Sequence, residues 1–439
     1  MRSIHVLPMI LAGGIGERLY PLTSNRAKPA VPFGANFRII DFTLMNCVCS
    51  GFRNIHILTQ YHTQSLTKHR TERWNFLSSE LGEYIELVPP KMRAPTGVYQ
   101  GTADAIYRNL DLLDLSRPDV VLILSGDHVY RADYRRFIDA HLEREADVTV
   151  LTGYVDPSES SAFGVVNVAE NGRVVRFIEK PADPTPYATN GRCQINLGVY
   201  CFNTTFLVER LVADAKKKTA HDFGKNILPS SVERGAVQAC SLDVISPDEK
   251  AYWRDVGSID SYFETSMDLL QTPPAFDLSD RRWPRNSRFR EWVPARYSTS
   301  ARIDGATVHG RNLVSSGVNI EGSQVVNCIL SPGVNVGKGC ELEGCILFPD
   351  AEIGEGAKLH RVIVEEGVKV PPGVRIGAKW SSGDLTLSKG GVMVIGANRN
   401  PANAAFEPQG AVEIPPRAEM PLFADRLQEP TLAYLGSVH

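Results

Sequence analysis

The sequence has little net charge, no long apolar run and no clustered cysteines. Its 439 residues carry a formal net charge of -3, which argues against a nucleic-acid surface because such a surface needs a concentrated basic face. No apolar run approaches the ~20 residues needed to span a bilayer. The chain also starts without a signal-peptide pattern, so we expect a cytoplasmic protein with no membrane contact.

Cysteine-based frameworks are unsupported as well. The eight cysteines include no C-x-x-C pair, and the ten histidines show no zinc spacing. Thiols scattered in this way are typical of buried, reduced side chains. We therefore expect neither a zinc site nor a disulfide scaffold.

Apolar segments alternate with helix-like segments through the first half of the chain. The apolar runs at 6–12, 54–59, 84–88 and 120–124 predict strands, and the patterns between them predict helices. Alternation of this kind is typical of a parallel sheet covered by helices. The predicted fold class is α/β, with a Rossmann-like, mostly parallel sheet.

A glycine-rich loop follows the first predicted strand. Gly13, Gly14 and Gly16 leave a bare backbone whose N–H groups can approach an anion closely. The dinucleotide motif would need a third glycine where Leu19 stands, and the Gly-Lys-Ser/Thr of the P-loop is absent. The loop therefore predicts a phosphate site of neither common type.

Basic residues follow this loop. Arg18, Arg26 and Lys28 could neutralise a triphosphate, with arginine giving forked hydrogen bonds and lysine a point charge. The alternative is an ordinary turn with solvated basic side chains. The rest of the chain favours the phosphate site.

Two acidic residues stand near the ends of apolar runs. Asp127 follows the strand predicted at 120–124, and ligands bind at the carboxyl edge of an open α/β sheet. Asp255 lies in a similar setting beside Gly257. A carboxylate facing polyphosphate needs a divalent cation between them, and Mg²⁺ suits one or two carboxylates plus phosphates. The structural alternatives are Asp127 as a helix cap and Asp255 in a buried ion pair.

Two further stretches carry polar residues at predicted element ends. Gly101 and Thr102 open a predicted helix that would offer free N–H donors, or they form an ordinary loop-to-helix junction. Asn171-Gly172 predicts a hairpin whose second strand ends at Glu179 and Lys180. Lys180 could bind a phosphate and Glu179 sugar hydroxyls, or the two could form an exposed charge pair.

A period appears after residue 300. An aliphatic residue followed by a turn recurs at intervals of 16 or 17 residues, with a second aliphatic residue six positions later. This nested period is typical of a hexapeptide-repeat, left-handed parallel β-helix, which stacks aliphatic residues inward. The repeat positions are Ile303, Ile320, Val336, Ile353 and Val370, and the last four are followed by Val326, Leu342, Leu359 and Ile376.

The chain is too long for one compact core. We expect a nucleotide-handling domain over residues 1–272, a linker over 273–300, the β-helix over 301–396 and a flexible tail over 397–439. Many hexapeptide proteins are acyltransferases, for which His309 or His360 would supply a base. Neither histidine has a supporting constellation, so a packing or assembly module explains the repeat better.

Several strings together resemble the sugar-nucleotide pyrophosphorylases, and most closely the ADP-glucose pyrophosphorylases. They include LAGGIGERL, NRAKPAVPFG, YQGTADAIYRNLD, SGDHVYRADY, FIEKPADP and YWRDVGSIDSY, within a similarity that covers residues 7–395. The resemblance implies that ATP and α-D-glucose 1-phosphate give ADP-glucose and pyrophosphate for glycogen or α-glucan synthesis. It also implies Mg²⁺, a homotetramer, and sugar-phosphate or nucleotide effectors.

The resemblance also implies roles for matching positions. The catalytic residues would be Arg18, Lys28 and Asp127, the metal ligands Asp127 and Asp255, and the effector contacts Arg26 and Arg38. ATP would contact Leu11, Gly13, Gly14, Gln60, Gly101, Thr102 and Asp127, and glucose 1-phosphate would contact Tyr99, Gly164, Glu179, Lys180 and Asn196. The family pattern differs at Asn196, where a serine is common, and at Asn25 and Ile15.

Two other functions stay open at this point. The chain could use a different nucleotide and sugar phosphate, or it could be a non-catalytic regulatory subunit. Retention of Arg18, Lys28, Asp127, Lys180 and Asp255 argues against the regulatory subunit.

Overall fold

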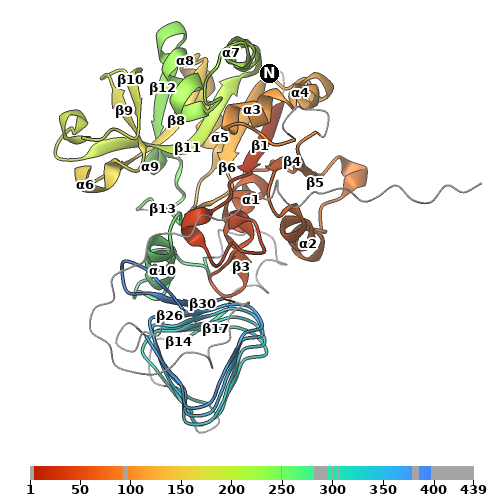
Figure 1. Cartoon of the computed structure of the whole chain (residues 1–439). Helices are drawn as coiled ribbons and strands as arrows, with labels where there is room; N and C mark the ends of the chain where they lie inside the picture. The colour runs from red at the N-terminus through yellow and green to blue at the C-terminus, as the bar shows by residue number, and fades with distance from the viewer. Residues whose placement is uncertain are drawn as a thin grey trace, which may run out of the picture.

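A mixed α/β sheet with flanking helices is followed along the chain by a coil of triangular cross-section (Figure 1). The computed structural model describes residues 4–91, 97–248, 250–280, 294–297, 301–303, 306–377 and 385–396. The predicted tail at 397–439 and most of the predicted linker lie outside these residues. No helix in the described ranges is long and apolar enough to cross a bilayer.

The centre of the sheet is parallel, as predicted. Strand β1 (Val6–Ala12) pairs with β4 (Asn54–Thr59) on one side and with β6 (Val120–Ser125) on the other, and β5 (Tyr84–Val88) continues beyond β4. Since the chain passes from β1 to β4 and β5 and returns to β6, the strand order reverses beside β1. Such a switch point opens a crevice at the carboxyl ends of the strands.

The other half of the sheet is largely antiparallel. Strand β11 (Cys193–Asn203) pairs with β6 and also with β8 (Val148–Val155), whose far side pairs with β12 (Val237–Ser241). The predicted hairpin forms as β9 (Gly164–Val168) and β10 (Val174–Glu179).

Helices and short elements complete this part of the protein. The longer helices are α1 (Ile39–Cys49), α2 (Thr63–Arg73), α3 (Thr102–Tyr107), α4 (Leu110–Ser116), α5 (Tyr134–Glu143), α7 (Thr204–Ala215), α8 (Leu228–Arg234) and α10 (Ile259–Asp268). Shorter elements are the turns η1 (Glu17–Leu19) and η2 (Lys28–Ala30), the helices α6 (Pro157–Ser160) and α9 (Leu242–Ile245), and the strands β7 (His128–Tyr130) and β13 (Trp253–Asp255).

One predicted helix is divided. The helix predicted after Gly101 ends at Tyr107 as α3, and α4 begins at Leu110, with Asn109 between them. The Asn109 amide donates to the Ala105 carbonyl 2.8 Å away and to the Tyr99 hydroxyl 2.9 Å away. Asparagine side chains compete with backbone hydrogen bonds in this way, which explains the interruption.

The predicted β-helix is present. Strands β18 (Asn319–Ile320), β21 (Asn335–Val336), β24 (Glu352–Ile353) and β27 (Lys369–Val370) stack in parallel to form one wall. The second wall is the sheet formed, in spatial order, by β14 (Ala295–Tyr297), β17 (Asn312–Val314), β20 (Ile329–Leu330), β23 (Ile346–Leu347), β26 (Val362–Val364), β30 (Met393–Ile395) and β29 (Thr386–Leu387). The third is formed by β15 (Ala301–Ile303), β16 (Ala306–His309), β19 (Gln324–Val326), β22 (Glu341–Glu343), β25 (Lys358–His360) and β28 (Arg375–Ile376). Aliphatic side chains line the interior, with Val336 and Val325 fully buried.

Two repeat assignments were wrong. Ile303 lies in β15 (Ala301–Ile303), which pairs antiparallel with β16 (Ala306–His309), because the first rung has no earlier rung on which to stack. The interior residue after Ile320 is Val325 rather than Val326, since Val325 is the residue in register with Leu342. The interval of 16 residues between Ile320 and Val336 shows that this rung is one residue shorter than those that follow.

The sheet domain and the coil are joined by polar and aromatic contacts. The Arg26 guanidinium lies 2.6 Å from Glu365 and 3.1 Å from Glu366 of the coil. Beside it, Tyr262 of α10 packs edge-on against Phe348. Arg26 and Glu365 are both buried, so this contact is part of the folded core and not a loose surface pairing.

Candidate active site

A cleft of about 420 Å³ opens at the carboxyl ends of β1, β4 and β6. Leu11, Leu58 and Ser125, which lie at or next to the ends of these strands, form its floor. The remaining lining residues are Gly13, Gly14, Gln60, Tyr99, Gly101, Thr102, Ala105, Asp127, Glu179, Asn196, Gly198, Tyr200, Asp222, Phe223 and Gly224. The cleft is therefore at the sheet edge where the sequence placed the ligand.

The glycine loop packs closely on the residue that follows β4. A Cβ on Gly13 would lie 3.3 Å from the Gln60 Cβ, so the absence of a side chain allows this contact. The Gln60 side-chain oxygen accepts a hydrogen bond of 3.0 Å from the Tyr99 N–H. Three segments distant in sequence are thereby held around one side of the cleft.

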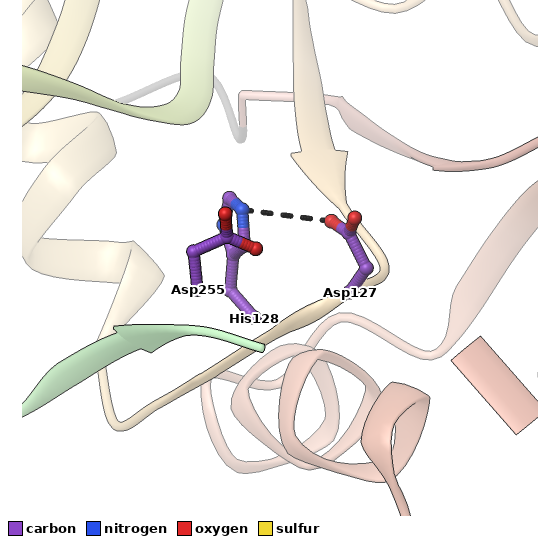
Figure 2. A group of neighbouring side chains, drawn as sticks. All are labelled: Asp127, His128 and Asp255. Carbon is purple, nitrogen blue, oxygen red and sulfur yellow. Dashed lines mark ion pairs between the residues drawn. The ribbon is translucent and has the colours of Figure 1, made fainter. Parts of the chain in front are cut away.

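Asp127 and Asp255 come together, as the metal hypothesis required. Strand β13, which ends at Asp255, pairs antiparallel with β7 and places Asp255 opposite His128. One ligand atom from each of Asp127, His128 and Asp255 lies within 4.8 Å of the others, and Figure 2 shows the three side chains facing one another. Asp127 lies between two strands and caps no helix, so the helix-cap alternative was wrong.

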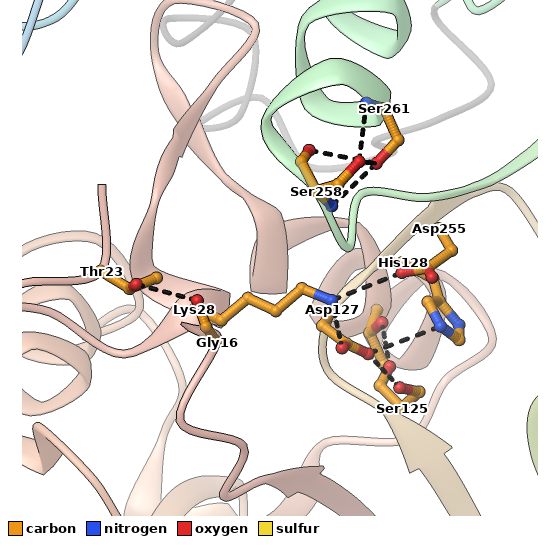
Figure 3. A network of polar contacts seen from close by, with 10 residues as sticks. Gly16, Thr23, Lys28, Ser125, Asp127, His128, Asp255, Ser258 and Ser261 are labelled. Atoms are coloured by element: carbon orange, nitrogen blue, oxygen red, sulfur yellow. Dashed lines mark hydrogen bonds and ion pairs between the residues drawn. The ribbon is translucent and has the colours of Figure 1, made fainter. Parts of the chain in front are cut away.

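Lys28 lies against both acids (Figure 3). Its ammonium nitrogen is 2.6 Å from an Asp127 oxygen and 3.4 Å from an Asp255 oxygen. Burial alone would lower the pKa of Lys28, but the two carboxylates outweigh burial and the net shift is upward. The lysine therefore stays charged and offsets the repulsion between the two acids.

Asp127 is held in place by several donors. The Ser125 hydroxyl donates to one of its oxygens, and the His128 ring nitrogen Nε2 lies 3.5 Å from the same oxygen. Burial would raise the pKa of Asp127, but the charges of Lys28 and His128 and the hydrogen bonds from Lys28 and Ser125 lower it below the ordinary value. The carboxylate is therefore ionised throughout the neutral pH range.

The donor set suits a hard divalent cation. The two converging carboxylates remain partly exposed, with side-chain exposures of 28% for Asp127 and 21% for Asp255, and Asp127 lines the cleft. Mg²⁺ is usually held by one or two carboxylates, with substrate phosphates and water completing its shell. The carboxylates at this site fit that pattern.

Two of the residues predicted to contact glucose 1-phosphate, Glu179 and Asn196, also line the cleft. Glu179 ends β10 beside Gly164, where a Cβ would come within 2.8 Å of the Glu179 carboxylate. Burial raises the pKa of Glu179, and the nearby Lys180 charge acts against that shift. The Lys180 ammonium lies 3.7 Å from Glu179 on a side chain that is 58% exposed, so it is free to turn toward a ligand.

Asn196 is tied to a residue that sequence reasoning missed. Its amide donates to the Tyr200 hydroxyl at 2.9 Å, and its oxygen accepts from the Gly198 N–H at 2.9 Å. Both partners line the cleft. The available sequence signal for this turn was a glycine two residues beyond a polar strand residue. In the structure Gly198 adopts a positive φ, which glycine tolerates.

Asp222 is a second missed residue. Its side chain accepts a hydrogen bond from the Lys225 N–H and so caps η5 (Phe223–Ile227). Its other oxygen accepts a hydrogen bond of 2.9 Å from the Thr102 hydroxyl, and the residue lines the cleft. Its capping role therefore hid its position at the site.

Two of the N–H donors at the start of the helix after Gly101 already have partners, which agrees with the alternative of an ordinary loop-to-helix junction. The N–H groups of Ala103 and Asp104 both donate to the His221 carbonyl, at 2.8 and 3.3 Å. A Cβ on Gly101 would run into the carbonyl oxygens of Ala220 and His221. Gly101, which lines the cleft, is thus required for close backbone packing against residues 220 and 221.

The predicted basic residues divide into two groups. Arg18 of η1 lies beside Gly257, where an added Cβ would come 2.8 Å from its guanidinium and 2.8 Å from an Asp255 oxygen. Arg26 and Arg38 instead face the coil, where Arg38 lies 3.7 Å from Glu366. The two predicted effector residues are therefore at the contact between the domains and do not line the cleft.

A glycine loop, an acid pair and a switch-point cleft on this sheet define a nucleotide-transferring enzyme. Residues 7–272 match the family model for Nucleotidyl transferase, and residues 293–395 match that for GlmU-like, C-terminal hexapeptide. Enzymes of the first family use a divalent metal. Within it, the chain belongs to the glucose-1-phosphate adenylyltransferases.

Similar curated proteins cover most of the chain. Glucose-1-phosphate adenylyltransferase 2 of Vibrio parahaemolyticus is 44% identical over 395 residues, which cover 89% of this chain and 98% of that protein. Glucose-1-phosphate adenylyltransferase 2 of Alkalilimnicola ehrlichii is 42% identical over 353 residues, covering 76% of this chain and 84% of that protein. The family resemblance predicted from the motifs is confirmed.

Proposed function

We propose that the chain transfers the adenylyl group of ATP to α-D-glucose 1-phosphate, giving ADP-glucose and pyrophosphate for glycogen or α-glucan synthesis. The observation that carries this proposal is the convergence of Asp127, Asp255 and Lys28 at the strand ends beside the glycine loop. The family membership supplies the two substrates.

The reaction needs no covalent enzyme intermediate. A phosphate oxygen of the sugar phosphate attacks the α-phosphorus of ATP in line, and the bond from that phosphorus to the bridging oxygen breaks as pyrophosphate leaves. Arg18 and Lys28 bind the nucleotide phosphates and stabilise the charge that grows on the leaving group. Glu179 and Asn196 hold the sugar hydroxyls, and Lys180 holds the sugar phosphate.

Mg²⁺ is the proposed cofactor. Asp127 and Asp255 would hold it, and when bound it would neutralise charge on the phosphate oxygens. The two substrates are bound and aligned by side chains of the protein itself.

Lys180→Ala is expected to raise the KM for glucose 1-phosphate about tenfold or more and to leave kcat and the KM for ATP nearly unchanged. The substitution removes a charged hydrogen bond made equally in the ground and transition states. Initial rates at varied concentrations of each substrate measure both constants. A change confined to the KM for ATP would contradict the assignment.

A nucleotide panel tests the proposed function. The purified chain is assayed with ATP, GTP and UTP, each with glucose 1-phosphate and with mannose 1-phosphate. Fast turnover only with ATP and glucose 1-phosphate is expected. Preference for another pair would point to a different nucleotidyl transferase, and no turnover with any pair would favour a regulatory subunit.

Assembly, regulation and location are also proposed from the family. We infer a homotetramer in the cytoplasm, with sugar-phosphate or nucleotide effectors acting through Arg26 and Arg38. These two arginines lie at the contact between domains, where a bound anion would act on both domains at once. Light scattering tests the homotetramer, and effector titrations test the regulation.

A further inference from the structure

Lys28 lies between Asp127 and Asp255, the two acids that are proposed to hold the metal ion. Its ammonium contacts one oxygen of Asp127 and one oxygen of Asp255, at 2.6 and 3.4 Å. Mg²⁺ binds carboxylate oxygens at about 2.0–2.1 Å. An ammonium group and a metal ion therefore cannot both lie between the same two oxygens.

The lysine approaches the acids from the protein interior. Lys28 is only 7% exposed, whereas the side chains of the acids are 28% and 21% exposed and Asp127 lines the cleft. A Cβ on Gly16 would lie 3.0 Å from both the Lys28 Cβ and the Thr23 methyl carbon, and the Thr23 hydroxyl donates to the Gly16 carbonyl at 2.9 Å. The stem of Lys28 is thus packed under the glycine loop, as Figure 3 shows.

The same loop offers the lysine a second set of partners. Gly13 and Gly14 line the cleft, so phosphates bound there would bring anionic oxygens to the loop under which Lys28 lies. A flexible side chain with one charged end can exchange carboxylate oxygens for phosphate oxygens by rotation. The phosphate oxygens of a bound nucleotide would therefore offer the Lys28 ammonium new partners, and the acid pair would be released.

We propose that Lys28 is a built-in substitute for the divalent cation in the nucleotide-free protein and that bound nucleotide phosphates draw it away from the acid pair. The inference rests on the proposed function, since the nucleotide draws the lysine away. It follows that the protein takes up its metal together with the nucleotide and binds metal alone only weakly.

Mn²⁺ titration of the nucleotide-free chain tests this, with electron paramagnetic resonance of the free ion as the readout. Lys28→Met should bind Mn²⁺ at least about tenfold more tightly than the wild type, because a competing charge is gone. Adding Asp127→Asn to Lys28→Met should abolish that gain. Lys68→Met, which removes an exposed lysine paired with Glu72 at 4.0 Å, should match the wild type.

Equal Mn²⁺ affinity in Lys28→Met and wild type would overturn the inference, and so would a gain that survives Asp127→Asn.

A second measurement needs no variant. Saturating Mn²⁺ should increase acetylation of Lys28 in the wild-type chain, measured by mass spectrometry, because the metal displaces the ammonium. Unchanged acetylation would also overturn the inference.

The proposed function can fail independently. With ATP present, Mn²⁺ binding by the wild type should depend on Asp127. If Asp127→Asn leaves that binding intact, the metal site itself is misassigned. If only the nucleotide-free comparison fails, the metal site stands and Lys28 does not compete for it.

Discussion

Asp127→Asn is expected to lower kcat by about 10³-fold or more while the protein stays folded. The variant keeps the size of the side chain and one oxygen, which can accept from Ser125 or from Lys28, whose bonds go to different carboxylate oxygens, but it removes the charge that would hold the metal. Loss of a preorganised electrostatic contact at a reacting centre costs about 10²–10³ in rate, and loss of a metal ligand costs more.

The measurement is steady-state turnover at saturating ATP, glucose 1-phosphate and Mg²⁺, with circular dichroism to confirm folding. Asp139→Asn is the matched control, because it makes the same substitution at an exposed position of α5. Turnover of Asp127→Asn close to that of the wild type would reject the metal role. A mild fall in pH should not reproduce the loss, because the pKa of Asp127 is held below its ordinary value.

Arg26→Met is expected to lower the free energy of unfolding by about 3–5 kcal/mol at pH 7.5. It leaves Glu365, which is 1% exposed, as an uncompensated charge between the two domains. Breaking a buried pair from one side costs that much because the desolvated partner remains. One oxygen of Glu365 already lacks a hydrogen-bond partner among the described residues, and the other would keep only the N–H of Glu366, at 2.8 Å. Urea unfolding measures the change.

The same variant should regain stability in mild acid. Burial raises the pKa of Glu365, and the Arg26 charge opposes that rise, so removing Arg26 raises the pKa further. The folded variant then binds a proton that the unfolded chain, with an ordinary carboxyl pKa, releases. Its deficit should therefore shrink as the pH falls from 7.5 toward 5.

Two further variants show whether burial is the cause. Arg361→Met breaks a partly exposed pair at the same junction, 3.0 Å from Glu264, and should cost about 1 kcal/mol or less. The double variant Arg26→Met with Glu365→Gln should recover most of the loss, because no charge is left buried. A double variant as unstable as Arg26→Met would show that packing, and not charge, is responsible.

The coil could be predicted in detail because its signal is local. Each rung repeats the same inward aliphatic positions, and parallel stacking such as that of Val336 on Ile353 follows directly from that period. Its start could not be predicted, because Ile303 has the right residue type but no earlier rung beneath it. The shorter first interval likewise shifted the interior position from Val326 to Val325.

Site residues that directly follow a strand could be predicted from the sequence. Asp127 and the glycines lie at the carboxyl edge because parallel strands end together there. Asp222, Tyr200 and Ser125 were missed because each has an ordinary local role, as a cap, a strand residue or a strand end. The pairing of Lys28 with both acids depends on tertiary distances that no sequence spacing encodes.

A single residue, Ala27, separates the arginine bound to the coil from the lysine bound to the acid pair. Ala27 is buried and extended, and its N–H is fixed by the Ser65 hydroxyl at 3.1 Å, so the segment has almost no slack. Any rigid-body displacement of the coil relative to the sheet must therefore pull on the segment that carries the Lys28 ammonium. The mechanical stiffness of this three-residue tether sets how far the two domains can separate before the site is distorted.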